Sequence, residues 1–179
     1  MARIFFGGPI KLVFVVSAAL LAAIASPGGA QTAARVQVVF AGPEKFTDVK
    51  DDYLGSDRNR DILLDQLKLH LQHRGVDHVP EGHQLRITIT DVDMAGEFEP
   101  GRNPGLGGAR IVRAVYPPRI ALRFELTDST GKAIGTGQRT LTDLAFLSKP
   151  DIYRNDLLKH EKSLLDDWLD REFLHNRRP

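Results

Sequence analysis

The chain of 179 residues contains no cysteine. This absence excludes disulfide bonds, catalysis by a thiol, metal sites built on thiolates and attachment of a lipid to an N-terminal cysteine. The stability of the folded domain must therefore come from packing alone.

The chain also lacks an excess of charge of either sign. It has 24 Lys and Arg against 23 Asp and Glu, with six His. A near-neutral protein has no long-range field that would attract nucleic acid or an anionic lipid surface. We therefore expect no nucleic-acid partner, and we interpret the short basic end at residues 175–178 as a solvated tail.

Sequence motifs of the common enzyme classes are missing. There is no Gly-x-Ser-x-Gly elbow of a serine hydrolase and no His-Glu-x-x-His pattern of a zinc protease. The glycine-rich stretch 101–108 lacks the Lys-Ser/Thr of a phosphate loop and leads into a strand. His70 and His73 have a spacing that metal ligands use, but we interpret them as helix surface. We assign no catalytic residue, cofactor or metal ligand from the sequence.

Only one long apolar run is present, and it lies near the start. Arg3 and Lys11 precede the apolar residues 12–25, and the helix-breaking, small-residue stretch 26–31 follows. This order is typical of a secretory signal peptide. We expect cleavage after Ala30, with Ala25 as second choice, and a single globular domain at 31–179 without a membrane span. The alternative is a retained anchor, for which the run is short.

Local patterns predict the elements of this domain. A helix should begin after Ser56 and end at Gly75, which we expect to adopt the left-handed cap. A second helix should span 156–174. Extended segments are predicted at 35–40, 85–90 and 111–115, followed by a hairpin of 120–126 and 134–141 with a bulge near Gly135 or Gly137. Leucines form the stripe of the first helix: Leu63, Leu64, Leu67 and Leu71.

The order of these elements indicates an α+β fold. The alternation of apolar and polar residues in the strands implies a sheet with one solvent-exposed face. We therefore expect a two-layer sandwich, in which a mostly antiparallel or mixed sheet of four to five strands carries two main helices on one face.

Acidic residues are densest directly after the strand at 85–90. With acids from other segments that the fold can bring close, they form our candidate cluster: Asp48, Asp91, Asp93, Glu97 and Asp143. We interpret the acidic segment as a loop whose carboxylates cap turns and pair with Arg102, Arg110 or Arg113. Two alternatives stay open, a site for a hard cation and a carboxylate pair for acid–base chemistry on a glycoside.

Two positions in this pattern should be inward-facing. Asp91 is in phase with Leu85, Ile87 and Ile89, so we expect it to point toward the core and to accept hydrogen bonds from backbone N–H groups of the 43–48 loop. Glu161 lies on the apolar side of the second helix and should form an ion pair with the sheet. Trp168 should anchor that helix against the strand that carries Leu122 and Phe124.

Several segments together resemble a known family. They are Phe40-x-x-Pro43-Glu44-Lys45-Phe46-Thr47-Asp48, the run Thr90–Phe98, Tyr116–Ile120, Leu141-Thr142-Asp143 and Glu161-Lys162-x-x-Leu165-x-x-Trp168. In this order they resemble a secreted bacterial family, domain of unknown function 3016, over about Val36 to Phe173. The glycine-rich insert at 105–108 departs from the pattern. The resemblance implies a secreted single domain and transfers no catalytic residue.

The sequence thus favours a periplasmic or secreted binding or envelope-accessory module, with an envelope protein or a small ligand as its partner. The alternative is a periplasmic hydrolase, with or without a bound cation, that uses the acidic segment after Asp91. If the acids gathered in one concave pocket, the hydrolase would gain support. If they were scattered or paired with arginines, the binding module would.

Overall fold

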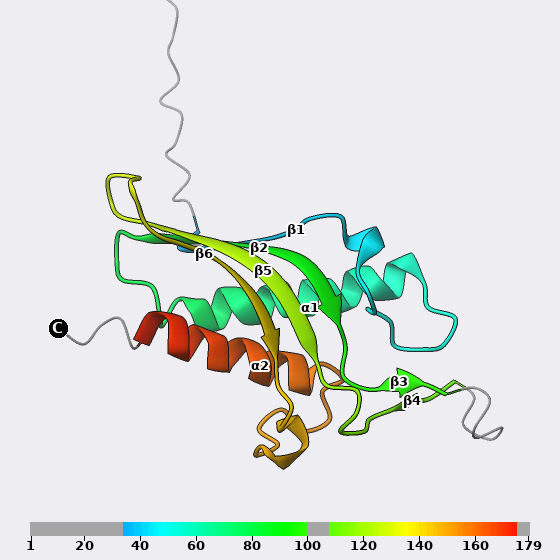
Figure 1. Cartoon of the computed structure of the whole chain (residues 1–179). Coiled ribbons are helices and arrows are strands. Elements are labelled where there is room, and N and C mark those ends of the chain that lie inside the picture. Colours follow the sequence, from blue (N-terminus) through cyan, green and yellow to red (C-terminus); the bar gives the residue numbers. More distant parts are fainter. Residues whose placement is uncertain (1–33, 100–107, 175–179) are drawn as a thin grey trace, which may run out of the picture. The chain divides into compact units, whose positions relative to one another are not determined.

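The structure is a computed structural model, and it describes residues 34–99 and 108–174 (Figure 1). The expected signal peptide and its cleavage site lie outside the described residues. The elements in chain order are β1 (Val36–Phe40), η1 (Pro43–Lys45), α1 (Asp57–Gly75), β2 (Gln84–Asp93), β3 (Glu97–Phe98), β4 (Arg110–Ile111), β5 (Arg119–Thr127), β6 (Ala133–Thr142), η3 (Phe146–Ser148), α2 (Lys159–Leu169) and the π-helical turn η4 (Asp170–Leu174).

The main sheet has four strands in the order β1-β2-β5-β6. The pair β1–β2 is parallel and the other two pairs are antiparallel. Both helices cover one face of this sheet (Figure 1). The predicted α+β sandwich with a mixed sheet is confirmed. The small second sheet, β3 with β4, falls in what the sequence indicated as a loop and an extended piece.

Helix α1 follows its sequence signals at the start but not at the end. The Oγ of Ser56 accepts a hydrogen bond from Asn59 N at 3.1 Å, and the predicted leucine stripe is buried. The prediction that Gly75 adopts a left-handed cap is wrong, because the backbone remains right-handed through Val76. A Cβ on Gly75 would lie 3.0 Å from Cγ2 of Val36, so its bare backbone lets the helix approach β1 closely.

A bulge in β2 decides which way the acidic segment faces. Leu85, Ile87 and Ile89 are buried as predicted, but the register with β5 shifts between Ile89 and Asp91. The inner position that alternation gave to Asp91 is instead taken by Val92, which is fully buried. The expected inward direction of Asp91 is therefore wrong, because an inserted residue turns each following side chain of the strand to the opposite face of the sheet.

The hairpin of β5 and β6 matches its prediction. The carboxylate of Asp128 accepts hydrogen bonds from the backbone N–H groups of Thr130 and Lys132 and so closes the turn. The pairing register shifts between Leu126 and Thr127, which leaves Ile134 as the extra residue directly before Gly135. This confirms the expected bulge.

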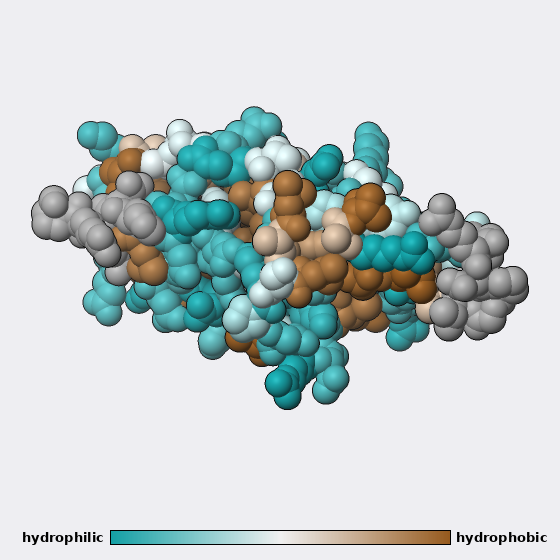
Figure 2. Space-filling view, turned by 60° about the horizontal axis from the view of Figure 1, so that its bottom comes forward, coloured by the Kyte–Doolittle hydropathy of each residue, from teal (hydrophilic) through white to brown (hydrophobic). Residues whose placement is uncertain are grey.

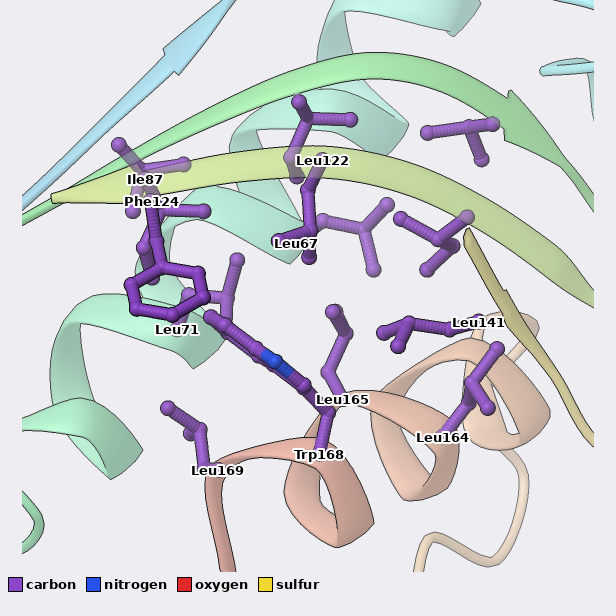
Figure 3. Close-up of a cluster of buried hydrophobic side chains, with 14 of the residues drawn as sticks. Leu67, Leu71, Ile87, Leu122, Phe124, Leu141, Leu164, Leu165, Trp168 and Leu169 are labelled. Carbon is purple, nitrogen blue, oxygen red and sulfur yellow. The ribbon is translucent and has the colours of Figure 1, made fainter. Parts of the chain in front are cut away.

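The core lies between the sheet and the helices (Figure 3). Trp168 of α2 packs against Phe124 of β5, with ring centroids 5.9 Å apart, as the sequence predicted. Helix α2 begins later than expected, because the Asp156 carboxylate accepts from Leu158 N and caps a turn there. Leu157 is consequently 46% exposed, so the prediction that it belongs to the core is wrong. Among residues 34–99 and 108–174, no helix has both the length and the apolar character to cross a membrane.

Candidate functional site

Asp91 joins the end of β2 to the loop after β1. Its two carboxylate oxygens accept hydrogen bonds from Thr47 N at 2.7 Å and from Thr47 Oγ1 at 2.8 Å. The predicted bond to a backbone N–H of the 43–48 loop is confirmed, although Asp91 lies on the outer face of the sheet. Both oxygens serve to hold two chain segments together.

Asp48 is the most deeply buried of the candidate acids. Its Oδ2 forms an ion pair with Arg110 Nη1 at 2.7 Å, and both side chains are buried. Arg110 also donates to the carbonyl oxygens of Gly96 and Lys50, and its guanidinium lies 4.5 Å from the ring centroid of Phe98. Arg110 thus neutralises Asp48 and binds the β2–β3 turn to the 48–50 segment.

Asp93 lies within range of the charges of three other candidate acids, Asp48, Asp91 and Glu97. Burial and then the negative charge of Asp48 raise the pKa of Asp93, against the opposing charge of Arg119. Glu97 is exposed and accepts from Phe98 N. Asp143 pairs with Lys149 at 2.6 Å. Within the described part of the chain, no group of three or more His, Asp or Glu side chains is arranged to hold a metal ion.

Glu161 is buried without the expected ion pair. Its Oε1 accepts a hydrogen bond from Ala95 N at 2.7 Å, whereas its Oε2 has no hydrogen-bond partner among the described residues. Burial raises the pKa of Glu161 to about 7, despite the Ala95 hydrogen bond and the charge of Arg110. The predicted ion pair is therefore wrong, and burial favours the protonated form of Glu161.

A cavity of about 290 Å³ lies where η3 and the loop after it meet the first turn of α2. Apolar side chains form one part of its wall: Val112, Phe146, Leu147, Pro150 and Ile152. His160 and Ser163 of α2 line another part. The ring of His160 packs edge-on against Phe146 at 4.8 Å, and burial, with the charge of Lys159, lowers its pKa.

A buried polar network supports one wall of this cavity. The Oδ2 of Asp166 accepts a hydrogen bond from Tyr153, a lining residue, and its Oδ1 is 2.9 Å from His70 Nε2 and 3.3 Å from Arg74 Nε. Burial and the bond to Asp166 raise the pKa of Tyr153 to about 12. Burial tends to raise the pKa of Asp166, but the hydrogen bonds from His70 and Tyr153 outweigh it and lower that pKa.

Sequence reasoning missed both the cavity and this network. The sequence predicts the pair His70 and His73 as helix surface, with His70 near the leucine stripe of the same helix, but it gives no partner for His70. Asp166 follows Leu165 directly in the apolar part of α2. The one sequence signal for this network was a histidine and an acid beside the buried faces of two helices. Tyr153 gave no signal, because it belongs to an irregular loop in which no periodic pattern predicts the direction of a side chain.

Comparison with known proteins gives one match. A model of the family described as "Protein of unknown function (DUF3016)" matches residues 34–171, which is nearly all of the described domain. Searches of curated proteins and of solved structures returned no match for this chain. The match confirms the resemblance found in the sequence, and the chain belongs to the DUF3016 family.

Proposed function

We propose that this protein is a non-enzymatic binding module of the periplasm or the cell exterior, which docks a partner protein through the apolar rim of the 290 Å³ cavity. The rim consists of Val112, Leu147 and Ile152, which line the cavity and are 42%, 50% and 67% exposed. This exposure carries the proposal, because soluble proteins rarely leave grouped apolar side chains uncovered unless they bind something. The signal-peptide pattern of residues 1–30 supports the location.

The face that carries α2 and the preceding loop exposes more apolar surface than the rim alone. Figure 2, which brings this side forward, shows apolar side chains reaching the surface near the middle of the view. Leu144 and Leu157, which flank Leu147 and Ile152 in the sequence, are exposed as well. We infer that the partner presents apolar side chains, one of which enters the cavity.

The charged groups near the cavity favour binding over catalysis. Lys149 is held by Asp143 and Asp167, and Lys159 is held by Asp151. The hydroxyl of Tyr153 donates a hydrogen bond to Asp166, and its raised pKa keeps it protonated, so Tyr153 is a poor base at neutral pH. Because these charges are balanced within the domain, the partner needs no excess of either sign at the rim.

The alternative of a hydrolase that uses the acids after Asp91 has weaker support. Asp91 has both oxygens bound to Thr47, and Asp48 is bound to Arg110. A nucleophile or a general base needs a side chain that can reach the substrate. These two carboxylates serve the packing of the loops instead.

Crosslinking with rim variants tests the docking surface. Purified protein would be crosslinked in envelope extract, and the captured proteins identified by mass spectrometry. Ile152→Asp and Leu147→Asp should each lose the main crosslinked partner, because a carboxylate at the rim would have to be desolvated on binding. Leu69→Asp is the matched control, since Leu69 is 65% exposed on α1. Equal capture by all three variants would refute the proposal.

A further inference from the structure

A second cavity lies at the start of β6. It has a volume of about 480 Å³ and is bounded by the start of β6, the end of β5, the loop before β2 and the π-helical turn η4. Its walls include Phe124, Leu126, Ile134 and Phe173. The volume falls within the range of pockets that enclose small molecules. The start of β6, at Ile134, Gly135 and Thr136, lines this cavity, whereas the apolar rim includes Leu147, which follows the end of β6.

Two backbone irregularities meet at this cavity. The bulge at Ile134 interrupts the β5–β6 ladder, and the π-helical turn supplies Glu172 and Phe173 to the opposite wall. Bulges redirect side chains, and π-helical turns widen a helix, and both occur frequently at functional sites. Here the bulge places Ile134, which is half exposed, along the cavity wall.

A glycine on β6 helps to keep the space open. Gly135 lines the cavity opposite Leu126, and a Cβ built on it would make only an ordinary contact, 3.7 Å from Leu126 Cβ. Packing therefore does not require glycine at 135. Gly137 differs, because a Cβ there would lie 2.6 Å from the ring of Phe124. A larger side chain at 135 can thus occupy the cavity without a clash at its first carbon.

The charged groups around this cavity are bound to other protein groups. Glu172 forms two hydrogen bonds with Arg139, at 2.7 and 2.8 Å, and His78 Nε2 lies 2.7 Å from Asp170. A charged ligand would therefore gain no free counter-ion in the interior, and the apolar walls favour hydrocarbon. His83 lines the cavity with its Nδ1 3.1 Å from the Glu81 carbonyl oxygen, which leaves Nε2 for a polar group of a ligand.

We propose that this cavity binds the hydrocarbon chain of an amphipathic, lipid-like ligand, with the polar end of the ligand near His83. The inference stands on the cavity alone and does not depend on the docking of a partner at the apolar rim. A free fatty acid and the acyl chain of a membrane lipid share this chemistry, so the test must distinguish them.

Binding of the neutral dye N-phenyl-1-naphthylamine to the full chain provides the assay. The dye should bind with a stoichiometry of one and a rise in fluorescence, and dodecanoic acid should displace it. A second arm incubates the protein with phosphatidylglycerol vesicles, removes the vesicles by sedimentation and looks for retained phospholipid by mass spectrometry, because the dye itself partitions into bilayers. Displacement by dodecanoic acid without retained phospholipid identifies a free fatty acid as the source, and retained phospholipid identifies a chain that can be taken from a bilayer. If dodecanoic acid does not displace the dye, the proposal fails.

Two variants and a control locate the bound dye. Gly135→Val should fill the cavity, and Ile134→Glu should place a carboxylate in its wall, so each should weaken dye binding at least tenfold. Thr140→Val is the matched control on the exposed part of β6, outside the cavity lining. Circular dichroism melts verify that the variants are folded. Unchanged affinity in both folded cavity variants, or an equal loss in Thr140→Val, would overturn the assignment.

Discussion

Glu161 and Ala95 tie the last helix to the turn between β2 and β3. The Oε1 of Glu161 accepts from Ala95 N at 2.7 Å, and the side chain of Glu161 is 1% exposed. Burial raises the pKa of this carboxylate, because removal from water costs the charged form more than the neutral form. We therefore expect the stability of the domain to depend on the protonation of Glu161.

The Glu161 pair predicts that stability falls as pH rises. The pKa of Glu161 is raised from 4.5 to about 7 in the folded state, so between these values the folded chain binds more protons than the unfolded chain. The free energy of unfolding should therefore decrease from about pH 4.5 to pH 7, by up to about 3 kcal/mol, and then level off. Urea melts across this range measure the effect.

Glu161→Gln separates this effect from other titrations. Glutamine keeps an oxygen that accepts from Ala95 N, and it cannot ionise. Melts of the variant should therefore lack this part of the pH dependence, and at pH 8 the variant should be more stable than the parent. Glu97→Gln is the matched control, because Glu97 is exposed. If Glu161→Gln and its parent show the same pH profile, Glu161 is not the responsible group.

Trp168→Ala should destabilise the domain by about 3–5 kcal/mol. Trp168 is buried, and its ring packs against Phe124 and Phe173, so truncation removes contacts from both the sheet and η4. Denaturant melts measure the loss, and Leu69→Ala on the exposed side of α1 serves as control. A loss below about 1 kcal/mol would contradict the packing of Trp168 against Phe124 and Phe173.

Asp91→Asn tests whether the acidic segment is structural. The substitution removes the charge from two hydrogen bonds with Thr47 and should cost about 1–2 kcal/mol. Asp93→Asn should cost less, because burial already raises the pKa of Asp93 and disfavours its charged form. Melts with and without excess chelator should agree. If chelator lowered the stability of the parent protein but not that of either variant, the result would indicate a metal site instead.

The signal-peptide pattern predicts an exported protein that begins at Gln31. Cleavage after Ala30 leaves that residue first, and the protein should be recovered in the soluble envelope fraction. N-terminal sequencing of the exported protein checks both points. A chain that begins at residue 1 and is found with the membranes would contradict the prediction.

Local pattern determined the elements and the fold class. The three- and four-residue spacing of Leu63, Leu67 and Leu71 predicted α1, and the alternation of Leu85, Ile87 and Ile89 predicted a half-buried strand, both confirmed. These signals are readable because the periods of 3.6 and 2 come from the geometry of the backbone itself. The family could also be recognised, because its motifs are short and local.

Tertiary structure decided which side chains meet. The bulge after Ile89 reversed the direction of Asp91, and the approach of α1 to β1, not a cap, accounts for Gly75. His70 and Asp166 are 96 residues apart in the sequence, and Glu161 and Ala95 are 66 apart. Periodicity assigns each residue to a face of its own element but does not say what covers that face. The buried network and both cavities arise only where separate elements pack together, so the three-dimensional fold had to supply them.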